Sequence, residues 1–139
     1  MKTTRKRNDS HGTEFGTWVR DRERVASRLG YIATDLDYVW QNYKTGHIML
    51  IEEKRVMSKL TFAQKQTFRE LDEMFKSNPM YRGFHLLQFE NLSPEDGSIF
   101  WDGVEITSDE LIEKLQFKDM DQTGYFDTVP NTLDALLSQ

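Results

Sequence analysis

The chain has no cysteine among its 139 residues, so it can form neither a disulfide framework nor a metal site built on thiolates. Its three histidines, at positions 11, 47 and 85, do not have the spacing of zinc ligands. No apolar run approaches the length of a membrane span, and the opening segment MKTTRKRNDSHG lacks the apolar stretch of a secretory signal. These absences predict an intracellular, cytoplasmic protein that is not held in a membrane.

Several catalytic motifs are also missing. The sequence has no glycine-rich phosphate loop, no G-x-S-x-G elbow and no nucleophilic cysteine. Nucleotide hydrolysis by a P-loop and covalent acyl transfer are therefore disfavoured.

What is present is enough apolar material for a core and an uneven distribution of charge. Hydrophobic residues make up 37% and aromatic residues 12% of the chain, which suits one compact domain, and the net charge is −5. An acidic chain argues against a surface that binds nucleic acid everywhere, but a local basic face is compatible with it. Acidic residues dominate after Glu90, whereas cations gather near the N-terminus. They form two groups there: Lys2, Arg5, Lys6 and Arg7, and then Arg20, Arg22, Arg24 and Arg28. The alternative is a solvated terminus followed by an ordinary helix surface.

Periodicity predicts the order of elements. Apolar residues at helical spacing indicate helices over residues 13–29 and 61–76, and alternation indicates a hairpin of two strands that ends at Arg55. Ser108 is expected to cap a short helix over residues 109–115. A third strand is expected over 81–90 and a short pair over 99–107. The pattern predicts an α/β (more strictly α+β) fold, with a central mixed sheet that contains the hairpin and is flanked by helices. We expect residues 1–12 to form a basic flexible arm, 13–117 the domain, and 118–139 an acidic tail that packs on the domain or on a partner.

The second strand of the hairpin, IMLIEEKR (48–55), ends in an unusual concentration of charge. If Thr45 and Gly46 form a two-residue turn, Asp37 lies opposite Lys54, and Glu52 is one diagonal step away. Side chains alternate along strands, so these three share a face, and neighbouring strands lie roughly 4.8 Å apart. Adjacent carboxylates repel unless a proton, a cation or a metal neutralises them, and Mg²⁺ prefers oxygen ligands of this kind. The pattern predicts a Mg²⁺ or Mn²⁺ site at Asp37 and Glu52, beside the ammonium of Lys54.

Asp37 followed fifteen residues later by EEK (Glu52–Lys54), in the order helix, hairpin, helix, strand, resembles the PD-(D/E)xK nuclease superfamily. That superfamily includes restriction enzymes, archaeal Holliday-junction resolvases and phage recombination nucleases, and the resemblance covers roughly residues 13–90. It implies that Asp37 and Glu52 bind the metal, that Lys54 assists the attacking water, and that Glu14 completes the catalytic set. By the same resemblance, the main-chain carbonyl of Glu53 is a further metal ligand.

The chain departs from the family pattern before the first acid. Thr34, Asp35 and Leu36 stand where a proline can precede it, and Asp35 is a rival of Asp37 on the same face. We favour Asp37 because it lies deeper in the strand and opposite Lys54.

The resemblance implies a metal-dependent deoxyribonuclease that hydrolyses phosphodiester bonds and leaves a 5′-phosphate, in phage-type DNA recombination, repair or processing. One site in a small chain suggests a homodimer, because each monomer would cut one strand. The alternative is a non-catalytic module on the same fold that binds nucleic acid or protein.

Several residues also have simpler explanations. Glu52 and Lys54 could form only a surface ion network, Glu14 could be an acid favoured by the helix dipole, and Thr61 with Gln64 forms a capping box. Among the aromatic residues, Trp18, Trp40 and Phe68 are expected in the core, and Phe100 and Trp101 at an exposed contact.

Overall fold

The computed structural model describes residues 13–128. The predicted basic arm, residues 1–12, and the end of the predicted acidic tail, residues 129–139, lie outside that range. The chain divides into two compact units: Met1–Asp35 with Leu60–Thr67 form the first, and Leu36–Lys59 with Phe68–Gln139 form the second. In the described part, no helix combines the length and the apolar character that crossing a membrane requires.

The first unit contains short helical segments. Helix α1 (Glu14–Arg20) begins at Thr13, whose hydroxyl accepts the amide of Gly16 at 2.9 Å, and two 3₁₀ turns follow it. The prediction of one helix over residues 13–29 is therefore wrong. Gly16, Thr17 and Val19 are weak helix formers, and a helix of this length gains little from propensity alone. The chain turns extended at Ala26, and the second 3₁₀ turn ends at Gly30 with φ 106°.

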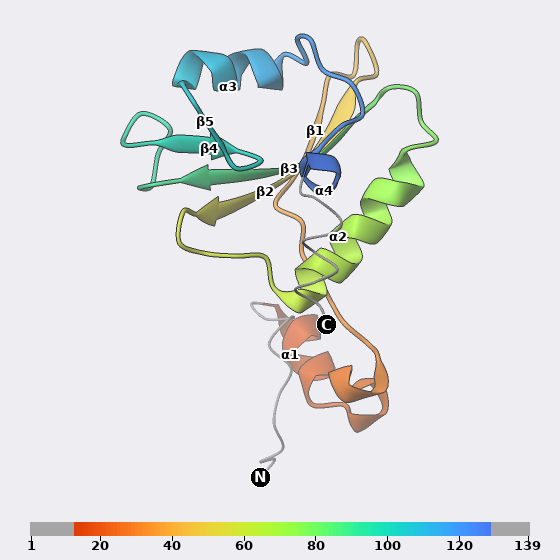
Figure 1. Cartoon of the computed structure of the whole chain (residues 1–139). Coiled ribbons are helices and arrows are strands. Elements are labelled where there is room, and N and C mark those ends of the chain that lie inside the picture. Colours follow the sequence, from red (N-terminus) through yellow and green to blue (C-terminus); the bar gives the residue numbers. More distant parts are fainter. Residues whose placement is uncertain (1–12, 129–139) are drawn as a thin grey trace. The chain divides into compact units, whose positions relative to one another are not determined.

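The second unit contains a five-stranded mixed sheet in the order β1-β2-β3-β4-β5 (Figure 1). Its strands are β1 (Tyr38–Gln41), β2 (Ile48–Arg55), β3 (Tyr81–Phe89), β4 (Ile99–Trp101) and β5 (Val104–Ile106). Only β2 and β3 are parallel, and helix α2 (Phe62–Phe75) connects them; the other neighbours are antiparallel. The predicted α+β fold, with a mixed sheet flanked by helices, is confirmed.

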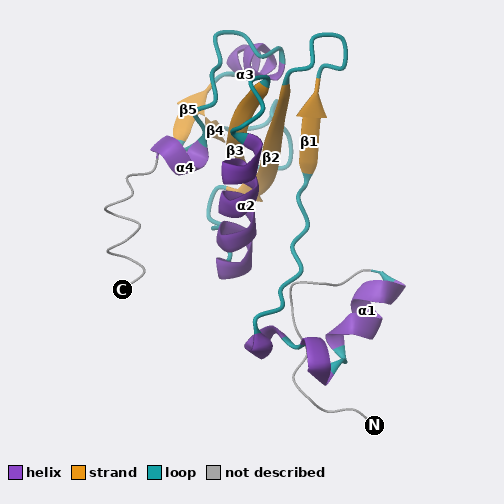
Figure 2. Cartoon of the chain, turned by 90° about the vertical axis from the view of Figure 1, so that its right-hand side faces the viewer, coloured by secondary structure: helices purple, strands orange, loops and turns teal. Residues whose placement is uncertain are grey.

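Each face of the sheet is covered by a helix, as Figures 1 and 2 show. Helix α3 (Ser108–Leu115) places Leu111 in a core that includes Met49, Ile51, Leu87 and Trp101. Its N-cap is Thr107, in a capping box with Glu110, and not Ser108 as expected, because Ser108 is already the first residue of the helix.

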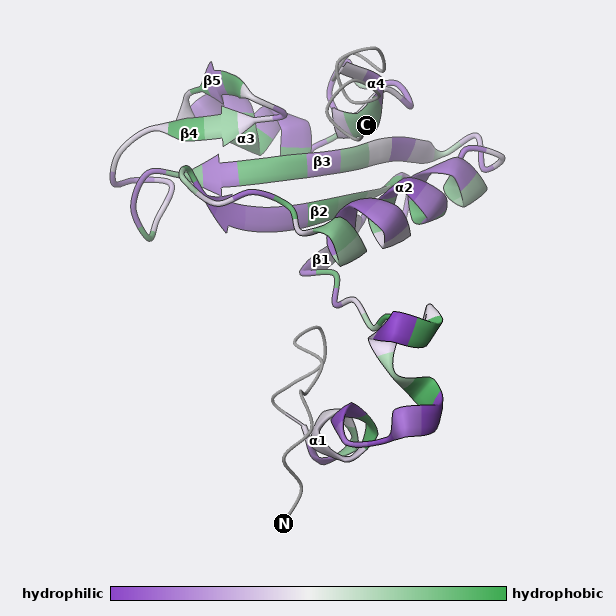
Figure 3. Ribbon diagram, turned by 60° about the horizontal axis from the view of Figure 1, so that its bottom comes forward, coloured by the Kyte–Doolittle hydropathy of each residue, from purple (hydrophilic) through white to green (hydrophobic). Residues whose placement is uncertain are grey.

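On the opposite face, Phe84 of β3 stacks between two aromatic rings. Phe68 of α2 lies at 4.8 Å and Phe126 of α4 (Tyr125–Thr128) at 5.2 Å between ring centroids. In Figure 3 the two central strands, β2 and β3, carry long hydrophobic stretches, as expected for strands covered on both faces.

The expectations for aromatic residues are partly wrong. Phe68 is fully buried, as expected, but Trp18 is 54% and Trp40 41% exposed, whereas Trp101 is only 4% exposed. Trp40 lies on the edge strand β1, which has a neighbour on one side only, and its indole N–H donates to the Leu115 carbonyl at 2.7 Å. Trp101 instead faces the α3 core and stacks on His85.

Candidate metal and phosphate site at the end of the hairpin

The hairpin places Asp37 directly opposite Glu52. The β1–β2 register pairs Tyr38 with Ile51 and Gln41 with Ile48, and one step further along this register Asp37 meets Glu52. The prediction that Asp37 lies opposite Lys54 is wrong by two residues.

The cause of the shift is Asn42. Its side-chain oxygen accepts the amides of Lys44 (2.9 Å) and Thr45 (3.2 Å), and its main-chain carbonyl accepts the amide of Gly46 at 2.7 Å. Asn42 itself donates to the His47 carbonyl at 2.9 Å, so the connecting loop is residues 43–46 and not a two-residue turn. Gly46 supplies the positive φ (89°) that closes such a loop. An asparagine four residues before a glycine is the sequence signal for this turn, through side-chain capping of the backbone.

A shift of two residues keeps the same side chains on the same face of the sheet, because strands alternate with a period of two. Asp37, Glu52 and Lys54 therefore still share a face. The Asp37 amide donates to Oε1 of Glu52 at 3.1 Å, and the Glu53 amide donates to Oδ2 of Asp37 at 2.9 Å. The two carboxylates are thus locked across the strand pair.

The three side chains differ in their access to water. Glu52 is only 4% exposed, Asp37 is exposed and Lys54 is half-buried. A carboxylate as buried as Glu52 is costly without hydrogen bonds or a cation. The exposed Asp37 beside it leaves one side of the pair open to solvent and to a ligand.

The carboxylate of Glu53 and its main-chain groups point in different directions. Its carboxylate lies on the other face, 3.5 Å from the Tyr38 hydroxyl, and this negative charge is the main cause that raises the pKa of Tyr38. Its amide points toward β1, and in a strand the N–H and C=O of one residue point the same way. The Glu53 carbonyl therefore points toward the edge where Asp37 lies, beyond the last β1–β2 pair.

These groups match the donor chemistry of a hard divalent cation. The carboxylates of Asp37 and Glu52 and the carbonyl of Glu53 are all oxygens, which Mg²⁺ and Mn²⁺ prefer. Within residues 13–128 no three His, Cys, Asp or Glu side chains are grouped so that they could hold a metal ion. A site here would therefore rely on water and substrate oxygens as well, which is usual for Mg²⁺.

The other predicted residues belong to the first unit. Glu14 is an exposed acid in the first turn of α1, and Asp35 is exposed ahead of β1. Gln64 and Thr61 form the expected capping box, with N···O distances of 3.0 and 3.1 Å. Within the second unit, the structure brings together Asp37, Glu52, Glu53 and Lys54.

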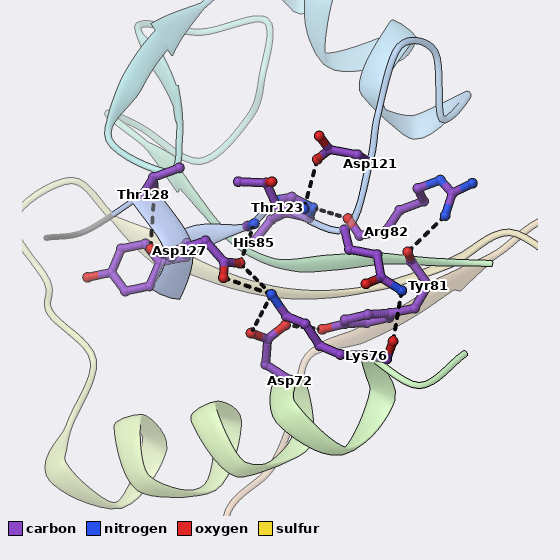
Figure 4. A network of polar contacts seen from close by, with 12 residues as sticks. Asp72, Lys76, Tyr81, Arg82, His85, Asp121, Thr123, Asp127 and Thr128 are labelled. Atoms are coloured by element: carbon purple, nitrogen blue, oxygen red, sulfur yellow. Dashed lines mark hydrogen bonds and ion pairs between the residues drawn. The ribbon is translucent and has the colours of Figure 1, made fainter. Parts of the chain in front are cut away.

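Sequence reasoning missed a buried polar network on the α2 side of the sheet (Figure 4). The Tyr81 hydroxyl donates to Asp72 at 2.5 Å, and Lys76 bridges Asp72 (3.8 Å) and Asp127 (2.7 Å). Burial raises the pKa of Asp72, and burial together with Asp72 raises the pKa of Tyr81. Burial opposes the charge on Lys76, but Asp127 and then Asp72 outweigh it and raise its pKa. The network ties α2 to β3 and to α4.

A second buried contact secures the turn between β4 and β5. Nδ1 of His85 lies 2.7 Å from Asp102, and Nε2 lies 2.7 Å from the Arg82 carbonyl. The Asp102 carboxylate and the Arg82 carbonyl thus hold the imidazole ring of His85 from both sides. It borders a cavity of about 330 Å³ that Trp101 and Lys114 also line. Both of its nitrogens are engaged, so this histidine is structural.

Comparisons with known proteins give no match: no family model, no curated protein and no solved structure resembles this chain closely enough to be identified with it.

Proposed function

We propose that the protein is a metal-dependent deoxyribonuclease of the PD-(D/E)xK type. The observation that carries the proposal is the direct pairing of Asp37 with the buried Glu52, with Lys54 on the same face of the sheet. The connection of β2 through α2 to a parallel β3 supports it, because the order helix, hairpin, helix, strand is the one on which the resemblance rests.

Each residue has a role in this mechanism. Asp37, Glu52 and the Glu53 carbonyl would hold Mg²⁺ or Mn²⁺, which, when bound, lowers the pKa of a coordinated water and polarises a phosphoryl oxygen. The Lys54 ammonium orients the attacking water and stabilises negative charge that grows on the phosphate. The displacement is in line and leaves the 5′-phosphate on the product.

The distribution of charge along the sequence supports a nucleic-acid substrate. Residues 1–67 have 13 Lys and Arg against 8 Asp and Glu, a net charge of +5, whereas residues 68–139 have 5 against 15, a net charge of −10. All four proposed site residues fall in the first half of the sequence. Lys54, Arg55 and Lys59 belong to the same unit as the site and attract phosphates.

With one cleavage centre per chain, cutting both strands of a duplex needs two copies, and we infer a homodimer for that purpose. The role in DNA recombination, repair or processing within the cell belongs to the same proposal.

A second function, a binding module without catalysis, is favoured by one observation. Asp37 and Glu52 each accept a main-chain amide across the hairpin, so both carboxylates already have a structural role. This alternative predicts nucleic-acid or protein binding that is independent of metal and tolerates Glu52→Gln.

The test is cleavage of a labelled panel of linear duplex, single-stranded and branched DNA, with Mg²⁺, with Mn²⁺ and with EDTA. The proposal predicts metal-dependent cutting that Lys54→Ala reduces by at least 10²-fold, while Lys118→Ala, an exposed lysine of the acidic half, cuts like the unmodified chain. DNA binding without cutting by well-folded protein would support the binding module instead.

A further inference from the structure

The turn that follows β2 is unusually well held for a surface connection. The Ser58 amide donates to the Arg55 carbonyl at 2.9 Å and closes the turn, and the Val56 amide donates to the Phe89 carbonyl at 3.0 Å. The side-chain amide of Gln88 donates to the carbonyls of Val56 (3.3 Å) and Ser58 (3.4 Å). The turn is therefore fixed to the end of β3.

Met57 projects from this turn and is 90% exposed, the largest value for a large hydrophobic side chain in residues 13–128. One exposed apolar residue is common on protein surfaces. The surroundings of Met57 are less common: residues 54–59 contain Lys54, Arg55 and Lys59 and no acidic residue. An apolar tip flanked by cations has the chemistry of a nucleic-acid contact.

The turn also continues directly from the candidate site. A strand rises about 3.3 Å per residue, so Arg55 lies roughly 10 Å along β2 from Glu52, which is about three base steps of 3.4 Å in a duplex. A DNA strand whose phosphate is bound through a divalent cation at Asp37 and Glu52 would therefore bring nearby bases within reach of Met57.

An acidic loop limits the direction that this DNA can take. Because β2 and β3 are parallel, their ends lie at the same edge of the sheet, and β3 continues into a loop that contains Glu90, Glu95 and Asp96. These carboxylates repel phosphates, whereas Arg55 and Lys59 attract them. The backbone of the DNA is thereby directed to the β2 side of this edge.

On the basis of the proposed function, we infer that the turn Arg55–Ser58, together with Lys59, selects DNA with a discontinuity near the cleaved phosphate. Arg55 and Lys59 contact the backbone, and Met57 packs on a base face that is already exposed at a flap, a branch or a boundary between single-stranded and duplex DNA. In an uninterrupted duplex that face is covered by stacking, and Met57 would first have to unstack a step. Methionine suits this role because its unbranched side chain adapts to irregular apolar surfaces.

The experiment measures binding with Ca²⁺ in place of Mg²⁺, so that the carboxylates keep a divalent cation, and the DNA is checked to be uncut at the end of each titration. Fluorescence anisotropy of the full chain is followed with a 5′-flap DNA and with a continuous duplex of the same length. Met57→Ala is expected to weaken flap binding about tenfold and to leave duplex binding unchanged, because it removes an apolar contact of the size of a base stack. Met74→Ala, which shortens a 63% exposed methionine of α2, is the matched control and should bind like the unmodified chain.

A second readout follows the base itself. With 2-aminopurine at the flap junction, the unmodified chain should change the fluorescence of the base, and Met57→Ala should not. Arg55→Ala is expected to weaken binding to both DNAs and to reduce the dependence of log K on log salt by about one unit.

Three results would overturn the inference: equal flap binding by Met57→Ala and the unmodified chain, an equal loss on flap and duplex, or no binding of either DNA. The cleavage panel decides the proposed function separately, since a chain that cuts DNA but does not need Met57 retains the nuclease proposal and loses this one.

Discussion

Asp37 and Glu52 face each other across β1 and β2, and the amide of Asp37 donates to the Glu52 carboxylate at 3.1 Å. This places an exposed carboxylate beside a buried one at the edge of the sheet. Two such groups bind a divalent cation better than either does alone.

A first prediction concerns metal binding without substrate. Mg²⁺ or Mn²⁺ at about 100 times its dissociation constant should stabilise the folded chain by about 2.7 kcal/mol, seen as a rise in Tm. Asp37→Asn should lose most of this rise. Glu105→Gln, a carboxylate on the exposed strand β5, should keep it. A rise of the same size in Asp37→Asn would exclude that residue from the metal site.

A second prediction concerns the turn that sets the hairpin register. Asn42→Ala removes the acceptor for two main-chain amides and should lower the free energy of unfolding by about 1 kcal/mol. Lys44→Ala changes the same loop without removing that acceptor and should be nearly neutral. Urea denaturation measures both, and equal stability of Asn42→Ala and the unmodified chain would contradict the role given to the side chain.

A third prediction concerns the buried network around Asp72. Tyr81→Phe leaves the Asp72 carboxylate without its closest donor and should destabilise the chain by about 1–3 kcal/mol at pH 7. The dependence on pH should change as well. The pKa of Tyr81 is raised above its ordinary 10.0, so its contribution to stability is complete below pH 10 and falls as the pH rises further.

Lys76 changes the pH dependence of stability in the same direction. Its pKa is raised as well, so the folded state keeps a proton that the unfolded chain releases near pH 10.5. Chemical denaturation between pH 9 and 11.5 should therefore show falling stability, with a shallower fall in Tyr81→Phe. A parallel fall in both proteins would show that Tyr81 does not carry a raised pKa.

A fourth prediction tests how closely the segment before α4 approaches β3. A Cβ on Gly124 would collide with the Phe84 carbonyl oxygen and lie 2.9 Å from the Phe84 nitrogen, and both are main-chain atoms that cannot rotate away. Gly124→Ala should cost about 1–3 kcal/mol through overpacking. An unchanged midpoint in urea would mean that residues 122–124 do not lie against β3 in this way.

Much of the fold could be predicted from local patterns. The strands, the hairpin and the helix between β2 and β3 follow from periodicity, and the shared face of Asp37, Glu52 and Lys54 survives an error of two residues in register. The register itself could not be obtained from the Thr45–Gly46 pair, because a side chain outside the expected turn, Asn42, determines the loop length.

Features that depend on contacts between residues far apart in the sequence could not be predicted from local patterns. Trp40, expected in the core, is exposed because β1 is an edge strand. Trp101, expected at an exposed contact, is buried because β4 has a neighbouring strand on each side and faces the α3 core. Tyr81 and Asp72 meet through the fold, nine residues apart, where no helical or strand spacing joins them. Helix α1 is shorter than the apolar pattern suggests because weak helix formers give it little stability of its own.

The most direct test of the central claim is single-turnover cleavage of a 5′-labelled DNA by Glu52→Gln in Mg²⁺, beside Glu105→Gln as the matched loss of an exposed carboxylate. The mechanism predicts cutting by the unmodified chain and by Glu105→Gln, with 5′-phosphate products and none in EDTA, and a rate at least 10²-fold lower in Glu52→Gln. Equal rates in the two variants, or no cutting by the folded unmodified chain, would contradict the claim that Asp37 and Glu52 form a nuclease site.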